Sequence, residues 1–181
     1  MTYLRETQKA ALAHVRAIAS RTSSDSLVID PITLKHLEVV AGSDGGVQGS
    51  LLHEIDRTAT AMGGRLLRSW LLRPLRALEP IQDRLDAVEE LAFRASERGK
   101  FRDALKGVHD LERLIGRIAL GTAGPRELVS LRQSLAVVPR VTLLLEALQA
   151  PLLRSLVAGL DDLPELRGRI ERTIVDEPPA I

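Results

Sequence analysis

The feature that most constrains the fold of this chain is the recurrence of apolar residues every three or four positions from Ser50 onward, interrupted by prolines. Ile81, Leu85, Val88 and Ala92 are separated by four, three and four residues, which places them on one face of a helix. Proline fits the first turn of a helix, where an N–H group lacks a partner anyway, but it disrupts a helix interior. The sequence therefore predicts helices that begin or end near its prolines.

The same spacing predicts helices of moderate length along most of the chain. Residues 3–19 carry an apolar stripe at helical spacing, and Asp30 followed by Pro31 is typical of the N-terminus of a short helix over 32–36. The remaining helices are expected at 50–56, 60–73, 80–92, 101–105, 111–120, 125–138, after Pro151 and after Pro164.

Two regions leave the helical pattern less regular. Pro139 would either kink the helix that begins at Pro125 or begin a new one. Near the N-terminus, the β-branched runs 27–29 and 37–40 could pair as two short strands before the break at Gly42–Gly46. The predicted fold class is therefore all-α, a bundle of seven to nine helices, with one small two-stranded β element near the N-terminus.

The composition supports helices and excludes several classes of protein. The 32 leucines and 20 alanines stand against one tryptophan, one tyrosine and two phenylalanines, which disfavours β-sheets. The net charge of +1 gives no reason to expect strong non-specific attraction to nucleic acid or acidic membranes. Cysteine is absent, which excludes disulfides and thiolate chemistry. No stretch approaches the roughly 18 uninterrupted apolar residues of a membrane span, so a soluble chain is expected.

Residues that could support catalysis or metal binding are poorly arranged. The pairs Glu89–Glu90 and Asp161–Asp162 are sequence neighbours whose side chains point about 100° apart on a helix, so we expect solvated helix ends rather than an acid–base pair. The stretch Gly42–Gly49 has no lysine and does not form a phosphate-binding loop. The histidines are too scattered for a metal site: His14, His36, His53 and His109. The sequence predicts no catalytic, cofactor-binding or metal-binding residues.

A basic stretch is formed by Arg65, Arg68, Arg73 and Arg76. It could meet a phosphate backbone or an acidic partner element. The near-neutral net charge and the lack of stacking aromatic residues favour a solvated helix face with salt bridges to local carboxylates.

One long motif connects the chain with a known family. The stretch 55–75 reads IDRTATAMGGRLLRSWLLRPL and contains the pattern D-x-T-x-T-x-M-G-x-R-x-L-x-x-W-L-x-x-P. This pattern resembles the core (lever) domain of bacterial MutS, a family of DNA mismatch-recognition ATPases. Within this stretch we single out Thr58, Met62, Gly63, Arg65, Leu66, Trp70, Leu71 and Pro74.

Further blocks resemble the same family in the same order. Residues 30–38 look like D-x-x-T-x-x-N-L-E through Asp30, Thr33 and Glu38, with His36 in place of the usual asparagine. The block 110–113 contributes Asp110, Glu112 and Arg113 to the structural motif. Other similar blocks lie at 3–9, 84–91, 125–128 and 174–179.

The resemblance implies a domain organisation and an activity for a longer parent protein. Residues 1–22 would be the end of the connector domain, and residues 23–181 the first half of the lever domain, before the clamp. The segment itself would be no enzyme and bind no cofactor, whereas the parent would be an ATPase that binds ATP and Mg²⁺. The implied partners are mismatched double-stranded DNA, reached through other domains, a second subunit in a homodimer and a MutL-type repair protein, in the bacterial cytoplasm near the nucleoid and not at a membrane.

A lever needs stiff helices rather than chemistry, so the motif residues are expected to be packing residues. Gly63 would permit a close helix approach, and apolar stripes on residues 79–120 would be exposed because their partner helices lie elsewhere. The entry turn would be fixed by Asp30, Thr33 and Glu38, and the hydrophobic core would be anchored by Met62, Leu66, Trp70 and Leu71.

Another function remains open on the sequence alone. The chain could be a stand-alone helical module, derived from the MutS lever domain, that binds protein partners. A small enzyme is disfavoured because no catalytic arrangement supports it.

Overall fold

The computed structural model describes residues 26–179, which form nine α-helices and no named strand. This part of the chain is all-α, as predicted. The predicted helix at 3–19 lies outside the described residues. The helices are α2 (Pro31–His36), α3 (Leu51–Ile55), α4 (Ala61–Leu72), α5 (Leu78–Phe93), α6 (Ala95–Leu105), α7 (Leu111–Ala119), α8 (Pro125–Glu146), α9 (Pro151–Ala158) and α10 (Pro164–Thr173).

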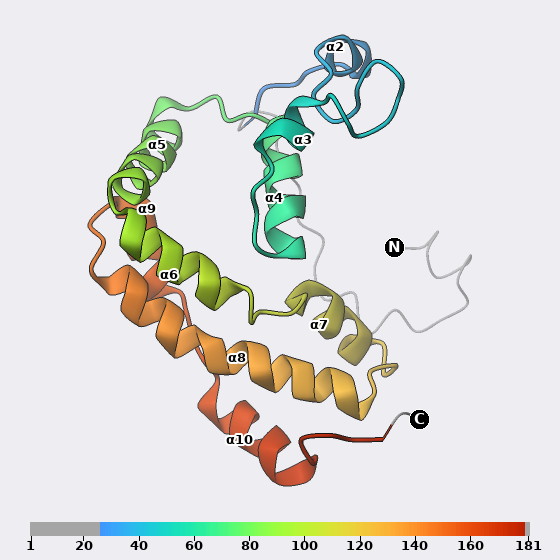
Figure 1. The fold of residues 1–181 in the computed structure, drawn as a ribbon, viewed down its shortest axis with the longest axis vertical. Coiled ribbons are helices and arrows are strands. Elements are labelled where there is room, and N and C mark those ends of the chain that lie inside the picture. Colours follow the sequence, from blue (N-terminus) through green and yellow to red (C-terminus); the bar gives the residue numbers. More distant parts are fainter. Residues whose placement is uncertain (1–25, 180–181) are drawn as a thin grey trace, which may run out of the picture.

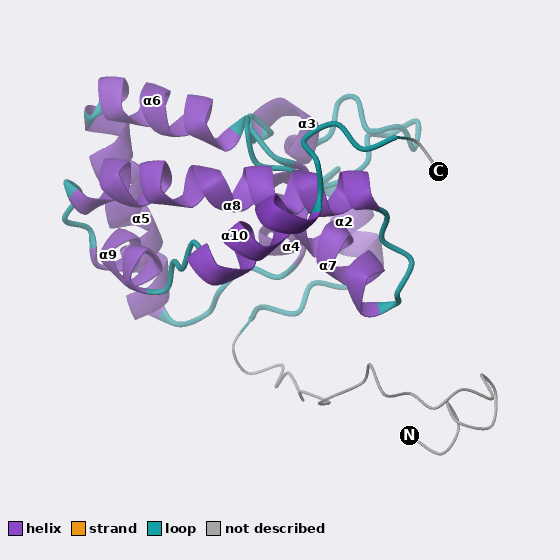
Figure 2. Ribbon diagram, turned by 90° about the horizontal axis from the view of Figure 1, so that it is seen from below, coloured by secondary structure: helices purple, strands orange, loops and turns teal. Residues whose placement is uncertain are grey.

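The helices fall into two groups joined by a short connection (Figure 1). We call residues 26–72, which contain α2, α3 and α4, the arm, and residues 78–179, which contain α5 to α10, the body. In the body, α8 lies between α6 and α10, an order that can be followed in the two perpendicular views (Figures 1 and 2). The helices α5, α7 and α9 pack around the same group.

Two clusters of buried apolar side chains hold the body together, and α8 contributes to both. The first cluster includes Val141 and Leu145 of α8, with Ala104 of α6 and Leu153 of α9, around Leu148, of which only 1% is exposed. The second cluster lies at the other end of α8, where the helix packs against α7 and α10. It consists of Leu114, Leu131, Leu135 and Ile170.

Proline positions explain most of the helix boundaries. Pro31, Pro125, Pro151 and Pro164 each occupy the first turn of a helix, as predicted. Pro139, in contrast, neither ends nor splits its helix, because α8 continues through it to Glu146. Its ring lies on the exposed side of α8, while the buried residues on either side of it keep the helix packed against its neighbours.

The predicted pairing of strands 27–29 and 37–40 is wrong. Asp30 begins α2 immediately after the first run, and residues 37–40 form turns that follow this helix. The backbone of the first run meets the connection between α4 and α5 instead: Ser26 forms an isolated antiparallel bridge with Leu75, and the N–H of Leu27 donates to the carbonyl of Pro74 at 2.7 Å.

The helix α8 has the length and the apolar composition of a membrane span. It contains Arg132 and Arg140, and six of its residues are buried in the body. Its position between other helices accounts for its apolar character, since the central helix of a bundle must bury side chains on more than one face.

We predict that Leu148→Ala lowers the free energy of unfolding by about 2–5 kcal/mol, because it leaves a cavity in the first cluster. Leu143→Ala is the matched control, since Leu143 is 70% exposed, and it should change the value by less than about 0.5 kcal/mol. Urea denaturation followed by circular dichroism measures both values. Equal effects would contradict the assignment of Leu148 to the core.

Candidate functional site

The arm and the body meet without a shared hydrophobic core. Between Leu52 and Ala87 the chain contains no buried residue, and α4 buries none of its side chains. The expectation that Met62, Leu66, Trp70 and Leu71 anchor a core is therefore not met: Leu66 and Trp70 are exposed, and the other two are half-buried.

Arg65 connects the two groups through a set of charged hydrogen bonds. Its Nη1 and Nη2 atoms donate to the two carboxylate oxygens of Asp110 at 2.8 and 2.7 Å. Its Nε and Nη2 atoms donate to Oε2 of Glu112 at 3.0 and 2.5 Å. We call Arg65, Asp110 and Glu112 the arginine clasp. Every hydrogen bond that the structure shows between residues 26–72 and residues 78–179 is donated by Arg65.

The local sequence places the two carboxylates where a cation can reach both. Asp110 is the N-cap of α7 and accepts from the backbone N–H of Arg113 at 3.2 Å, while Glu112 lies in the first turn of the same helix. Carboxylates are favoured at a helix N-terminus because the helix dipole is positive there. On the other side of the clasp, α4 begins at Thr60, whose hydroxyl accepts from the N–H of Gly63 at 3.0 Å. Both sides of the clasp are thus fixed by helix caps.

Hydrogen bonding in the clasp favours the charged form of both partners. The side-chain hydrogen bonds from Arg65, followed by the backbone N–H of Arg113, lower the pKa of Asp110 from 3.8 to about 2. The bonds to Asp110 and then to Glu112 raise the pKa of Arg65 further above its usual range. Arg65 and Asp110 are therefore both charged at neutral pH.

A second contact joins the arm and the body beside α4. The guanidinium carbon of Arg84, on α5, lies 3.7 Å from the centre of the Trp70 ring. This distance is typical of a cation–π contact. Each side of the junction thus contributes one arginine, Arg65 from the arm and Arg84 from the body.

The structure corrects the interpretation of the basic stretch. Arg65 pairs with Asp110 and Glu112, which are 45 and 47 residues away in the sequence, rather than with local carboxylates. No periodicity could identify this pairing, because it depends on how α4 meets α7. The motif blocks named all three residues, and the structure brings them together.

The other motif residues define local turns of the arm. Asp30 accepts from the backbone N–H groups of Ile32 and Thr33, and the Thr33 hydroxyl donates to its second oxygen at 2.5 Å. Glu38, with a φ of 48°, turns the chain after α2, and its carbonyl accepts from the N–H of Leu51. These bonds hold α2 against the start of α3.

Gly63 and Thr58 meet at the beginning of α4. A Cβ atom on Gly63 would lie 3.1 Å from Oγ1 of Thr60 and 3.3 Å from Cβ of Thr58. The sequence predicted that another helix would approach Gly63 closely. The close approach is instead made by the loop before α4. Thr58 is held in that loop by its hydroxyl, which donates to Asp56 at 2.8 Å.

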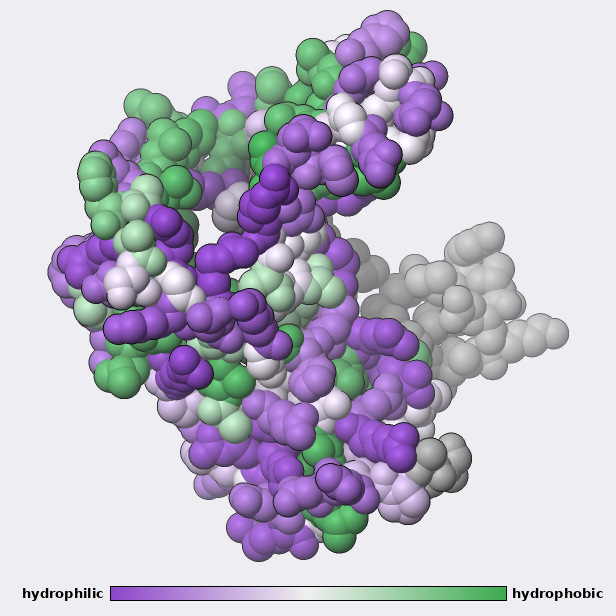
Figure 3. Space-filling model, viewed as in Figure 1, coloured by the Kyte–Doolittle hydropathy of each residue, from purple (hydrophilic) through white to green (hydrophobic). Residues whose placement is uncertain are grey.

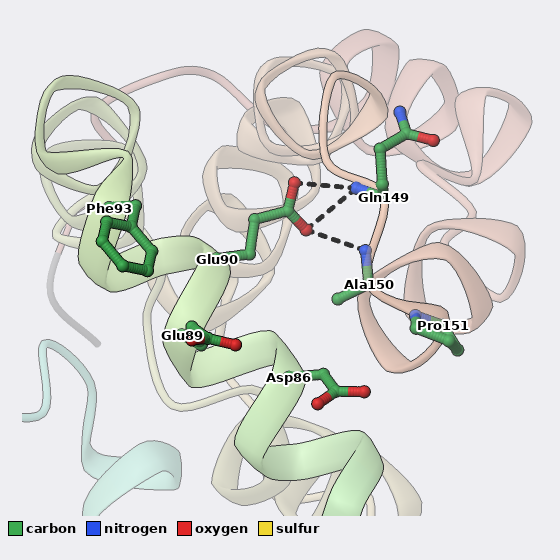
Figure 4. Close-up of a pocket in the computed structure, with 7 residues that line it drawn as sticks. All are labelled: Asp86, Glu89, Glu90, Phe93, Gln149, Ala150 and Pro151. Atoms are coloured by element: carbon green, nitrogen blue, oxygen red, sulfur yellow. Dashed lines mark hydrogen bonds between the residues drawn. The ribbon is translucent and has the colours of Figure 1, made fainter.

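Glu90 has a structural role that sequence analysis missed. Its carboxylate accepts from the backbone N–H groups of Gln149 and Ala150, at 2.9 and 2.7 Å, just before α9 begins (Figure 4). The bond from Ala150 is the main cause of a lowered pKa for Glu90. The prediction that Glu89–Glu90 is a solvated helix end is wrong for Glu90, which caps a helix from a distant part of the chain.

A shallow pocket of about 460 Å³ surrounds this cap, lined by α5 and the start of α9 (Figure 4). Asp86 and Glu89 also line it, but Glu90 is already occupied by the two backbone N–H groups. Residues 26–179 contain no group of three or more histidine and acidic side chains that could hold a metal ion.

Comparison with known proteins points to one family. The family described as MutS domain III matches residues 32–181. Three relatives are each called DNA mismatch repair protein MutS. The protein of Symbiobacterium thermophilum is 47% identical over 99% of the chain, that of Myxococcus xanthus 44% over 99%, and that of Pelotomaculum thermopropionicum 43% over 99%. The matched region is 21%, 20% and 21% of these relatives, so the chain spans about a fifth of their length.

We predict that the contribution of Asp110 to stability depends on pH. Because the pKa of Asp110 is about 2 in the folded chain and 3.8 ordinarily, its contribution is complete above about pH 4 and is lost as the pH falls towards 2. Asp110→Asn keeps a helix cap but removes the charge. Thermal melts from about pH 7 to about pH 2 should show a wild-type advantage over this variant that shrinks at the acidic end. An advantage independent of pH would contradict the lowered pKa.

We also predict that Glu90→Ala lowers the free energy of unfolding by about 1 kcal/mol, because two backbone N–H groups lose their partner. The neighbour Glu89 is exposed, and Glu89→Ala should change the value by less than about 0.5 kcal/mol. Urea denaturation of the two variants measures the difference. Equal values would argue against the cap.

Proposed function

The chain belongs to the MutS domain III family, and we propose that within a longer protein it is the lever that couples nucleotide state to clamping on mismatched DNA. The observation that carries the proposal is α8. This helix of 22 residues, about 33 Å long, is buried near both ends in different apolar clusters. An element packed in this way moves as one piece and can transmit a displacement between two ends of a domain.

Chemistry and partners are assigned to other parts of the longer protein. We propose that ATP and Mg²⁺ bind elsewhere, that mismatched duplex DNA is contacted through other domains, and that the protein acts as a homodimer with a MutL-type partner in the cytoplasm near the nucleoid. Residues 1–22 would end the connector domain, and residues 23–181 would form the first half of the lever domain. These proposals rest on family membership.

Exposed apolar side chains support a place within a larger assembly. The expectation that residues 79–120 carry exposed apolar stripes is confirmed, with Leu85, Val88 and Phe93 on α5 and Ile115 and Leu120 near α7. Figure 3 shows hydrophobic residues gathered over α5. Patches of this kind mark contact surfaces. We propose that further helices of the same domain cover them.

The proposal is tested by softening α8 in the longer protein without changing its buried faces. Gln133 and Ala136 are exposed, and replacing both by glycine adds backbone freedom in the middle of the helix. We expect ATP to change the Kd for mismatched DNA by a factor that is at least roughly threefold smaller than in the wild type. Fluorescence anisotropy with labelled DNA, with and without ATP, measures this factor.

The matched control places two glycines in a helix that joins only one cluster. Arg169 and Glu171 are exposed on α10, and their replacement by glycine should leave the ATP effect unchanged. Mismatch binding without nucleotide should be similar in all three proteins. An equal loss in both glycine variants would indicate a general effect on stability, and an unchanged ATP effect in the α8 variant would indicate that α8 is not the lever; either result would overturn the proposal.

A further inference from the structure

We propose that the arginine clasp is a releasable latch, which docks the arm on the body when closed and lets the arm swing about the connection at residues 73–77 when open. The inference rests on the contacts between arm and body in this chain. It holds or fails independently of the coupling function proposed above.

The body and the arm are held in place by different kinds of contact. The body is held by buried apolar side chains, whereas the hydrogen bonds and the cation–π contact between residues 26–72 and 78–179 are those of the exposed clasp and of Trp70 with Arg84. In the clasp, 48% of the Arg65 side chain and 68% of the Glu112 side chain are accessible to water. Exposed ion pairs contribute little to stability and are screened by salt. The hydrogen bonds of the clasp thus define one docked position of the arm, but they stabilise it only weakly.

The arm is held together by contacts between its own helices. Its own contacts are internal: α2 is tied to α3 by backbone bonds from Leu51 and Leu52 to Glu38 and Val39, and α3 packs on α4. The surface is hollowed between the arm and α5 (Figure 3). The arm can therefore move as a unit without breaking a buried contact with the body among residues 26–179.

The connection between the arm and the body, residues 73–77, is not helical. After α4 ends, Arg73 and Ala77 have non-helical backbone conformations, and Pro74 between them cannot continue a helix. The bond from Leu27 to the Pro74 carbonyl attaches the start of the arm to this same connection. Within residues 26–179, the covalent connection of the arm and its backbone bond to that connection therefore lie at one place, as a hinge requires.

Arg65 suits a latch because its bonds are directional. The planar guanidinium donates two parallel bonds to Asp110 and two further bonds to Glu112. Such bonds fix one orientation of α4 relative to α7, and they are lost together when the groups separate. The latch therefore has two distinct states, closed and open.

The chain contains its own reporter of these states. Trp70 is its single tryptophan, and it lies on the arm against Arg84 of the body. Because cysteine is absent, Leu120→Cys at the exposed end of α7 provides a single site for a dansyl acceptor. Energy transfer from Trp70 to this acceptor then measures the separation of arm and body, and acrylamide quenching measures the exposure of the ring.

The first experiment titrates salt on the wild-type chain with the acceptor in place. Raising the salt from about 0.1 M to about 1 M shortens the screening length from about 10 Å to about 3 Å. We expect transfer efficiency to fall and the quenching constant to rise by roughly twofold, since Trp70 is only 38% exposed in the docked arm. Helix content by circular dichroism should remain constant.

The second experiment opens the latch by substitution. Arg65→Ala, and separately Asp110→Asn combined with Glu112→Gln, should give the high-salt values already at low salt and show little further response to salt. Arg68→Ala on the same helix is the matched control and should behave as the wild type. Arg84→Ala should increase quenching but leave energy transfer unchanged, which separates loss of the ring contact from movement of the arm.

The proposal is overturned if the Arg65 variant keeps wild-type transfer efficiency and quenching, or if salt changes neither value in the wild type. If a clasp variant loses helix content, the salt titration of the wild type decides alone, because it needs no substitution in the clasp. A response of the Arg68 control equal to that of the Arg65 variant would also overturn it, since the effect would then be one of net charge.

Discussion

The packing of α8 is the interaction on which the rest of the structure depends. Near its start, Leu131 and Leu135 meet α7 and α10, and beyond Pro139, Val141 and Leu145 meet α6 and α9. Among the described helices, α8 is thus the one that contributes to both clusters. Because interiors are close-packed, a displacement at one cluster is carried to the other as a movement of the whole helix. The lever function that we propose requires such a helix to connect the two clusters.

The arm follows a different physical rule. Its apolar residues on α4 remain partly exposed, and its position is set by charge and hydrogen-bond direction at the arginine clasp. Burial gives large, non-directional stabilisation, while a bidentate arginine pair gives orientation with little stabilisation when water has access to it. The molecule therefore combines a part that resists movement with a part whose docking can be exchanged. Such a division is useful in a protein that changes state.

The positions of the helices could be predicted from the sequence better than the contacts between them. Proline at the first turn located the starts of α2, α8, α9 and α10, because this effect is local to the backbone. At Pro139 local reasoning left two alternatives, a kink or a new helix, and the continuous α8 excludes the new helix. Local reasoning failed for the strands near the N-terminus, because the backbone of the first run pairs with the connection after α4 and the carbonyls of Glu38 and Val39 accept from the start of α3.

The candidate site shows where reasoning from sequence ends. The motif blocks singled out Arg65, Asp110 and Glu112, but only the meeting of α4 with α7 makes them one site. Glu90 was expected to be a solvated helix end, since a carboxylate that accepts from a backbone N–H group 60 residues away leaves no local pattern. In both cases the hydrogen bonds that join distant segments form at the start of a helix, α7 for the clasp and α9 for Glu90. Local side chains cap α2, α3, α4 and α7, whereas the acceptor just before α9 comes from a distant helix, and the sequence alone does not show at which helix start this happens.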